Sequence, residues 1–293
     1  MNDFSTRLIP GFIYVLLILM SLLYNQYSFI LMILICCVII IFEYGKVLRK
    51  DVEHIKFISI KKQPEFGFIF FNTEFTPLCS FFILFGFGVS MILNNPKSSE
   101  WVELSVLILS IIYFSFLIYF ILTKKLLFSS NRRKTWPLIG VIFSFLLIIY
   151  TALIYDYSKY KVLFILYLFL VWGIDTLGYI IGVKFGKNKL FESLSPKKSI
   201  EGAIGSFVFA ILYSILVFYI TNLSFLFCFI LCISVCLLAI LGDLGQSKVK
   251  RELKIKDFGK LLPGHGGLYD RFDSILFSFP FLYLIIKISL HVS

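Results

Sequence analysis

The stretch "LSFLFCFILCISVCLLAIL", residues 223–241, contains no charged side chain over its whole length. A bilayer has a hydrocarbon core about 30 Å thick, which requires roughly 20 apolar residues for one helical span. The stretch does not alternate between apolar and polar residues, as a membrane β-strand would. It therefore predicts a transmembrane α-helix, and it sets the class of fold for the chain.

Comparable apolar runs recur along almost the whole sequence. Hydrophobic residues make up 59% of the chain and charged residues 15%, well below the roughly 25% charged residues of a soluble domain. We expect an all-α, polytopic integral membrane protein with about nine transmembrane helices, in a single membrane domain over 1–293. Its catalytic helices and cytoplasmic loops should lie in 161–293, after the N-terminal spans of 1–160. The candidate spans are 8–24, 28–44, 77–94, 102–123, 137–155, 162–183, 203–221, 223–241 and 274–290.

The positions of lysine and arginine predict the orientation of these spans. The loops after the second, fourth, sixth and eighth spans hold most of the 28 Lys and Arg residues, whereas the intervening loops hold only Lys97, Lys159 and Lys161. Basic loops remain in the cytoplasm, so we expect a cytoplasmic N-terminus and an external C-terminus. The net charge of +11 then reflects topology and attraction to anionic lipids, and we expect no nucleic-acid binding.

A first polar cluster begins inside a span, in "VWGIDTLGYIIGVKFGKNKL" (171–190). Asp175 lies well within an apolar run, where a carboxylate costs a few kcal/mol. We expect Asp175 to face a cavity or a substrate. The alternative is a helix-packing role in which a neighbouring side chain satisfies it.

The chain then continues as "SLSPKKSIEGAIGS" (193–206). Ser195, Lys197 and Lys198 precede a glycine-rich helix start. Two ammonium groups, a hydroxyl and the N–H groups of a helix N-terminus suit a phosphate group. The alternative is a basic anchor that only fixes topology.

A second cluster follows the span 223–241. If the helix continues, Asp243, Ser247 and Lys250 share one face at i, i+4 and i+7. The next segment, "KDFGKLLPGHGGLYDRFDS" (256–274), brings Asp270 to the start of the last span. Carboxylates suit Mg²⁺, which usually binds one or two of them together with substrate phosphates. The pattern predicts metal-dependent phosphoryl or nucleotidyl transfer at the cytoplasmic lipid interface, with salt-bridged loop charges as the alternative.

This second cluster resembles the motif of the phosphatidate cytidylyltransferase (CDP-diacylglycerol synthase) family. An upstream pattern also matches, at Asp175, at 185–187, at 195–198 and at 201–202, so that the resemblance covers about 165–274. One departure is Gln246, at a position where the family often has an acid. The matching motif residues are Ser247, Lys250, Arg251, Lys256, Asp257, Gly259, Leu262, Pro263, His265, Gly266, Gly267, Asp270, Arg271 and Asp273.

The resemblance implies a reaction, a metal and a set of roles. CTP and phosphatidate would give CDP-diacylglycerol and diphosphate, in phospholipid biosynthesis at the cytoplasmic face of a bacterial membrane. Asp243 and Asp270 would hold Mg²⁺, with a monovalent cation reported beside it in the family. Membrane lipids are expected partners, and a homodimer is one of the open oligomeric states.

The expected site residues fall into two groups. Catalytic roles are expected for Asp243, Lys250, Arg251, His265, Asp270 and Arg271. Substrate contacts are expected for Asp175, Ser195, Lys197, Lys198, Ser247, Lys256, Asp257, Gly266, Gly267 and Asp273.

Two other functions compete with this prediction. CTP-dependent transfer to another lipid, by a polyprenol kinase or an ether-lipid cytidylyltransferase, would use similar chemistry. A transporter would instead place Asp175 in its substrate path. Visible internal repeats would favour a transporter, and the sequence shows none.

Overall fold

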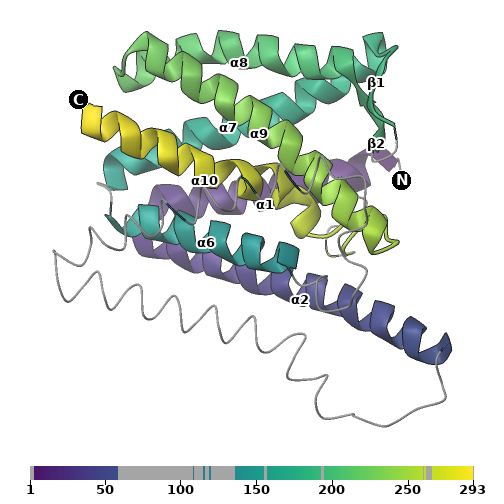
Figure 1. The fold of residues 1–293 in the computed structure, drawn as a ribbon. Coiled ribbons are helices and arrows are strands. Elements are labelled where there is room, and N and C mark those ends of the chain that lie inside the picture. The colour runs from purple at the N-terminus through teal and green to yellow at the C-terminus, as the bar shows by residue number, and fades with distance from the viewer. Residues whose placement is uncertain are drawn as a thin grey trace. The chain divides into compact units, whose positions relative to one another are not determined.

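A computed structural model describes residues 3–58, 136–154, 157–192, 195–259 and 266–292, together with residues 108, 115, 119 and 261. Within these residues the protein is built almost entirely of α-helices, with one small β-hairpin (Figure 1). The helices are α1 (Asp3–Tyr24), α2 (Gln26–Ile58), α6 (Trp136–Ile154), α7 (Tyr157–Phe185), α8 (Ile200–Thr221), α9 (Phe225–Glu252) and α10 (Tyr269–Val292). The strands are β1 (Lys189–Phe191) and β2 (Ser195–Ser199).

Helices long and apolar enough to cross a membrane confirm the predicted class, an all-α membrane protein. Four such helices occur among the described residues, and two shorter apolar helices cover Ile13–Tyr24 and Gly140–Leu153. The predicted span 77–94 and most of 102–123 lie outside the described residues, so the count of nine stays a prediction. The four long segments are Gln26–Leu48, Tyr157–Phe185, Ile200–Thr221 and Phe225–Glu252.

The helix α2 extends well beyond its apolar part. The sequence predicts a span that ends at residue 44 and a loop over 45–76, but the helix continues to Ile58, so the start of that loop was placed wrongly. Hydropathy reports only where a helix leaves the lipid, whereas the backbone hydrogen bonds can continue in water. No proline occurs between Gln26 and Pro64, so nothing in this segment removes a backbone donor.

The hairpin is a second departure from the expected all-helical chain. β1 and β2 pair antiparallel, with Lys189 opposite Ser199 and Phe191 opposite Ser195. The sequence predicts a basic loop in this segment. The strands are short and mainly polar, so they carry neither the length nor the alternation that predicts a strand.

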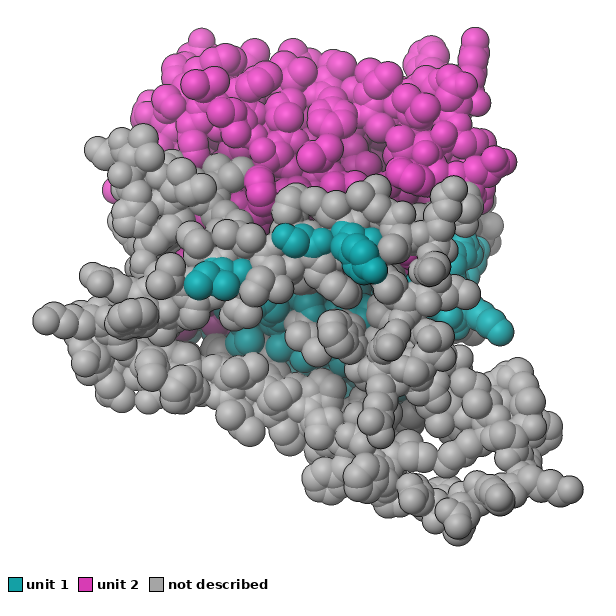
Figure 2. Space-filling model, viewed as in Figure 1, with its two compact units in different colours: residues 1–146, 249–271 teal, residues 147–248, 272–293 magenta. Residues whose placement is uncertain are grey.

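The chain divides into two compact units, coloured separately in Figure 2. Unit 1 comprises residues 1–146 and 249–271, and unit 2 comprises residues 147–248 and 272–293. Each unit therefore combines segments from distant parts of the sequence. In particular, the loop between α9 and α10 belongs with the N-terminal helices.

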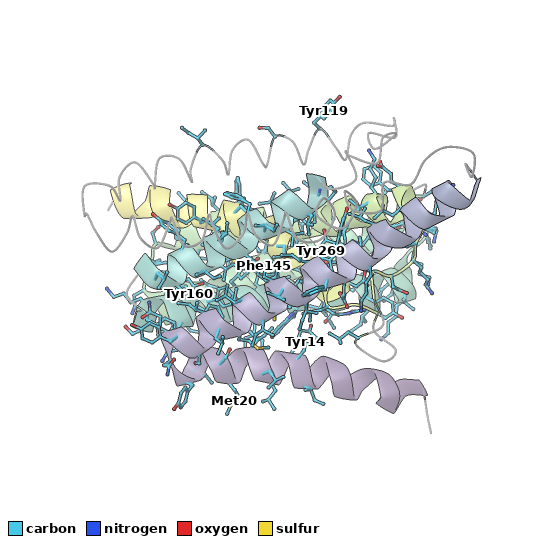
Figure 3. The ribbon with its side chains drawn as sticks, turned by 90° about the horizontal axis from the view of Figure 1, so that it is seen from below. Tyr14, Met20, Tyr119, Phe145, Tyr160 and Tyr269 are labelled. Atoms are coloured by element: carbon cyan, nitrogen blue, oxygen red, sulfur yellow. The ribbon has the colours of Figure 1, made fainter. Side chains whose placement is uncertain are left out.

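In unit 1, α1 and α2 contact each other and both contribute buried apolar side chains. Leu22 and Phe29 are fully buried, whereas Met20 is 60% exposed and points away from α2 (Figure 3). Large apolar side chains on the outer face of α1 are expected when lipid, and not water, is the surrounding medium.

In unit 2, small residues allow α7 and α8 to approach closely. A Cβ atom added to Gly202 would lie 2.5 Å from the carbonyl oxygen of Gly178 and 3.2 Å from the Cα of Gly182. Ser206 Oγ donates a hydrogen bond to the carbonyl oxygen of Ile174 at 2.8 Å. Such contacts between small residues and backbone are how helices associate in lipid, and they fix the start of α8 relative to the end of α7.

Candidate active site

The hairpin and the first turn of α8 are joined by two side chains. Ser199 is the N-cap residue of α8 and its Oγ accepts a hydrogen bond from Gly202 N at 3.1 Å. The Glu201 carboxylate accepts from Lys187 N at 3.1 Å, from Asn188 N and from Asn188 Nδ2. These bonds satisfy backbone donors at the helix start and at the beginning of β1, so the basic strand β2 has a defined position in unit 2.

Lys198 on β2 forms an ion pair with Asp243 on α9. Ser247 Oγ donates to Asp243 Oδ1 at 3.5 Å, as the predicted i, i+4 spacing requires. The side chains of Lys198 and Asp243 are 28% and 26% exposed, so water and a polar ligand can reach them. The structure thus brings together Lys198, Asp243 and Ser247.

The neighbouring residues of β2 are placed differently. Lys197 is exposed, whereas Ser195 and Lys198 are half-buried. The pairing register shifts within this segment, since Lys189 and Phe191 are two residues apart while their partners Ser199 and Ser195 are four apart. The difference in exposure, and not strand alternation, therefore distinguishes the two lysines.

Asp175 is exposed on α7 and accepts a hydrogen bond from Ser274 Oγ at 3.4 Å. Asp273 is half-buried, and its Oδ1 accepts from Ser274 N at 2.8 Å. A neighbouring side chain therefore contacts Asp175, and its exposure leaves both the substrate role and the packing role as predictions.

Asp270, at the start of α10, is almost completely buried with 8% exposure. Its Oδ2 accepts hydrogen bonds from Phe258 N and from Gly267 N, both at 2.9 Å. Its Oδ1 lies 3.1 Å from Lys250 Nζ. Hydrogen bonds to a charged acceptor are stronger than neutral ones, so Asp270 joins the two ends of the loop to each other and to α9.

The glycines of the loop leave room for carboxylates of the protein itself. Gly266 has a φ of 89°, in the left-handed region that favours glycine, and a Cβ atom there would lie 3.0 Å from Asp270 Oδ2. A Cβ atom at Gly267 would lie 2.6 Å from Glu43 Oε2. Gly267 is therefore required by a residue of α2 that sequence analysis did not single out.

That residue, Glu43, accepts hydrogen bonds from two consecutive backbone donors. Its Oε1 lies 3.1 Å from Leu268 N and its Oε2 lies 3.1 Å from Tyr269 N. Glu43 is 8% exposed. In the sequence, Glu43 is a single acidic residue at the end of the apolar run 28–44. Such a residue is equally typical of the polar end of any membrane span.

The other expected residues differ in their exposure. Arg251, Lys256 and Asp257 are exposed, and Arg271 is half-buried. His265 lies outside the described residues. Gln246 is fully buried on α9, where a neutral amide avoids the cost of burying an acid at this position.

Carboxylate oxygens are the donors that a magnesium site would need. Asp243 belongs to unit 2 and Asp270 to unit 1, and each has an ammonium group beside it. In the part of the chain that the structure describes, no three His, Cys, Asp or Glu side chains gather as a metal site. Carboxylate oxygens are the ligand type that a hard cation such as Mg²⁺ prefers.

The similarity to known proteins covers almost the whole chain. The cytidylyltransferase family model matches residues 5–289. The phosphatidate cytidylyltransferase of Bacillus subtilis (strain 168) is 38% identical over 134 residues, which are 45% of this chain and 50% of that relative. The enzyme of the same name from Staphylococcus saprophyticus is 32% identical over 211 residues, 70% of this chain and 78% of the relative.

A third relative, the phosphatidate cytidylyltransferase of Thermotoga maritima, is 33% identical over 192 residues, 61% of this chain and 69% of the relative. The family match also covers the N-terminal helices, where the sequence showed no motif. The chain therefore belongs to the cytidylyltransferase family, as the motif from Ser247 to Asp273 indicated, and it is a nucleotidyltransferase built of membrane helices.

Proposed function

We propose that this protein transfers the cytidylyl group of CTP to phosphatidate, giving CDP-diacylglycerol and diphosphate. The relatives that bear the name phosphatidate cytidylyltransferase support this substrate pair. The observation that carries the proposal is the pairing of two acids with two lysines, Asp243 on α9 with Lys198 on β2, and Asp270 at the start of α10 with Lys250 near the end of α9. Alternating positive and negative groups of this kind suit polyphosphates and a cation together.

In the proposed reaction, a phosphate oxygen of phosphatidate attacks the α-phosphorus of CTP. The bond from that phosphorus to the oxygen bridging toward the β-phosphate breaks, and diphosphate leaves with the electron pair. The attacking phosphate is already ionised near pH 7, so no general base is required. Catalysis then depends on positioning and on neutralising charge.

The lysines of the two ion pairs would neutralise that charge. Lys198 and Lys250 each carry a positive charge beside an acid, and phosphate oxygens would compete with the acids for these ammonium groups. Arg251, Arg271 and Lys197 add donors on exposed or half-buried side chains. Preorganised donors are effective because they do not have to reorient as charge moves during the reaction.

We also propose that Asp243 and Asp270 hold Mg²⁺, with a monovalent cation beside it. Both supply carboxylate oxygens, the ligand type that Mg²⁺ prefers. When bound, Mg²⁺ would neutralise phosphate charge and hold the two substrates together. The role of this chain is to hold the two carboxylates in place, Asp243 by Lys198 and Ser247 and Asp270 by Lys250 and two backbone N–H groups.

The proposed setting is the cytoplasmic face of a bacterial cytoplasmic membrane, where the protein would act as a monomer or as a homodimer in contact with membrane lipids. The Lys and Arg distribution supports a cytoplasmic N-terminus and an external C-terminus. CTP is made in the cytoplasm, so the basic loops would meet it on that side.

The test is an assay of the purified protein in detergent micelles that contain phosphatidate. CTP labelled at the α-phosphate should yield a labelled lipid, and CTP labelled at the γ-phosphate should yield labelled diphosphate. Removal of Mg²⁺ with a chelator should stop both signals, and its return should restore them. Labelled lipid from γ-labelled CTP with a polyprenol acceptor would instead identify a lipid kinase.

A further inference from the structure

Glu43 is a buried acid outside the motif that identifies the family. It lies on α2, in the candidate span Gln26–Leu48, and is 8% exposed. A buried carboxylate costs free energy unless hydrogen bonds or charges compensate for it. Here the compensation comes from Leu268 N and Tyr269 N, each 3.1 Å from a different oxygen, where α10 begins.

The surroundings of Glu43 are shaped to admit it. Cβ atoms added to Gly259 and Gly267 would clash with its oxygens, Oε1 and Oε2 respectively. The next residue, Tyr44, is fully buried and stacks on Phe258 with ring centroids 5.3 Å apart. The rings of Tyr44 and Tyr269 (labelled in Figure 3) also pack edge to face, with centroids 6.0 Å apart. Two consecutive residues of α2 therefore contact both ends of the loop between Phe258 and Tyr269.

Glu43 and Asp270 share the binding of this loop. Three consecutive backbone donors are divided between them, since Gly267 N bonds to Asp270 while Leu268 N and Tyr269 N bond to Glu43. Asp270 also accepts from Phe258 N at 2.9 Å. If the backbone at Leu268 moved, Gly267 N and the Asp270 backbone would move with it, because they are next to it in the chain.

We propose that Glu43 is a positioning residue for the reaction, which acts on Asp270 through the backbone of the loop. The inference rests on the proposed function, because it takes Asp270 to be part of the catalytic machinery. This role does not require Glu43 to contact a substrate. Its contribution is to fix the loop so that Asp270 presents its carboxylate beside Lys250 in one orientation.

The variant Glu43→Gln tests this role with little change in volume. An amide retains one oxygen acceptor, but its NH₂ group would face a backbone N–H donor, so one of the two hydrogen bonds is lost. The matched control is Glu192→Gln, the same chemical change at an exposed residue of the hairpin turn. Glu43→Asp keeps the charge but is one methylene shorter, and it should recover part of the effect.

The first readout is amide hydrogen exchange in the purified protein without substrate. Glu43→Gln should accelerate exchange at Leu268 or Tyr269, whichever of the two N–H groups loses its acceptor. It should also accelerate exchange by about tenfold or more at Phe258 and Gly267, which bond only to Asp270. If Glu43 only capped the start of α10, exchange would accelerate at Leu268 or Tyr269 but stay slow at Phe258 and Gly267. That result would overturn the proposal.

The second readout is the division of the kinetic effect between kcat and KM. Glu43→Gln should lower kcat by about 10–100-fold, the range typical of residues that orient a metal ligand, while KM for CTP changes only a few-fold. Normal kcat in folded Glu43→Gln would also overturn the proposal. If Glu43→Gln does not fold, both measurements are made on Glu43→Asp. Unchanged exchange at Phe258 and Gly267, or a normal kcat, would again overturn the proposal.

The two readouts separate this proposal from the proposed function. Hydrogen exchange requires no substrate, so the link from Glu43 to Asp270 can be confirmed even if the wild-type protein does not use phosphatidate. An active wild-type enzyme whose Glu43→Gln variant is equally active would refute the positioning role alone.

Discussion

Lys250 and Asp270, twenty residues apart in the sequence, meet as a nearly buried ion pair, with Nζ 3.1 Å from Oδ1. The Asp270 side chain is 3% exposed and that of Lys250 is 17% exposed. The same carboxylate uses its other oxygen to bind two backbone N–H groups. Asp270 is thus an organiser of the loop as well as the proposed metal ligand, and substitutions have to distinguish these two roles.

The variant Asp270→Asn should distinguish the role of Asp270 in the loop from its proposed role as a metal ligand. The amide oxygen can still accept from Phe258 N and Gly267 N, so the loop should keep much of its structure. The charge that would offset Mg²⁺ is lost, and cytidylyl transfer should fall by at least about 10–100-fold, the range seen for residues that only support a metal ligand. The measurement is turnover of labelled CTP by the purified, folded variant. Activity within a few-fold of the wild type would show that Asp270 is a salt-bridge partner and no more.

Two lysines adjacent in the sequence should behave differently. Lys198 pairs with Asp243, whereas Lys197 is exposed. Lys198→Gln should raise KM for CTP by about tenfold, because Asp243 and the phosphates both lose their ammonium group, while Lys197→Gln should raise it less. Stability should change little in either variant, since partly exposed ion pairs contribute about 0–1 kcal/mol. Steady-state kinetics of the two single variants provides the test, and equal kinetics would contradict this difference.

Gly202→Ala should destabilise unit 2. The added methyl group would lie 2.5 Å from the Gly178 carbonyl oxygen, and overpacking of this kind typically costs about 1–3 kcal/mol. Gly182→Ala is the matched control, because its nearest neighbour is the Ser199 hydroxyl at 3.1 Å and alanine favours helix by about 1 kcal/mol.

Thermal unfolding in detergent can be followed with a thiol-reactive dye for both variants. The described cysteines are all buried and should react only on unfolding; they are Cys36, Cys37, Cys228, Cys232 and Cys236. A Gly202→Ala protein that melts at or above the temperature of Gly182→Ala would show that α7 and α8 have room to separate.

The orientation of the chain is open to a direct measurement. The basic loops should be cytoplasmic, so single cysteines placed at positions 198 and 254 of a cysteine-free protein should react only after the cell is permeabilised. A cysteine at position 198 that an impermeant reagent labels in intact cells would exclude the proposed topology.

The sequence was most informative where burial in lipid and helix formation coincide. The apolar runs 137–155 and 203–221 closely match α6 and α8, because apolar side chains are required along the whole helix in a bilayer. The spacing of Asp243 and Ser247 likewise predicted a contact on one helix face, and the hydrogen bond between them confirms it. These are local properties that a short window of sequence contains.

Other features depend on partners that no short window contains. The hairpin of β1 and β2 depends partly on Glu201, which binds backbone groups 13 and 14 residues upstream. The role of Glu43 depends on Leu268, 225 residues further along the chain. An acid that follows an apolar run looks the same whether it faces water or a distant loop, and only the fold separates the two cases.

The long separation between Glu43 and Leu268 has a consequence for biogenesis. At roughly 5–20 residues per second, the ribosome requires on the order of 10–45 s to travel from the codon of Glu43 to that of Leu268. Throughout this interval α2 carries an acid whose final partners do not yet exist, and water or a proton must satisfy it. Unit 1 includes residues 249–271, so its assembly can be completed only after nearly the whole polypeptide has been synthesised.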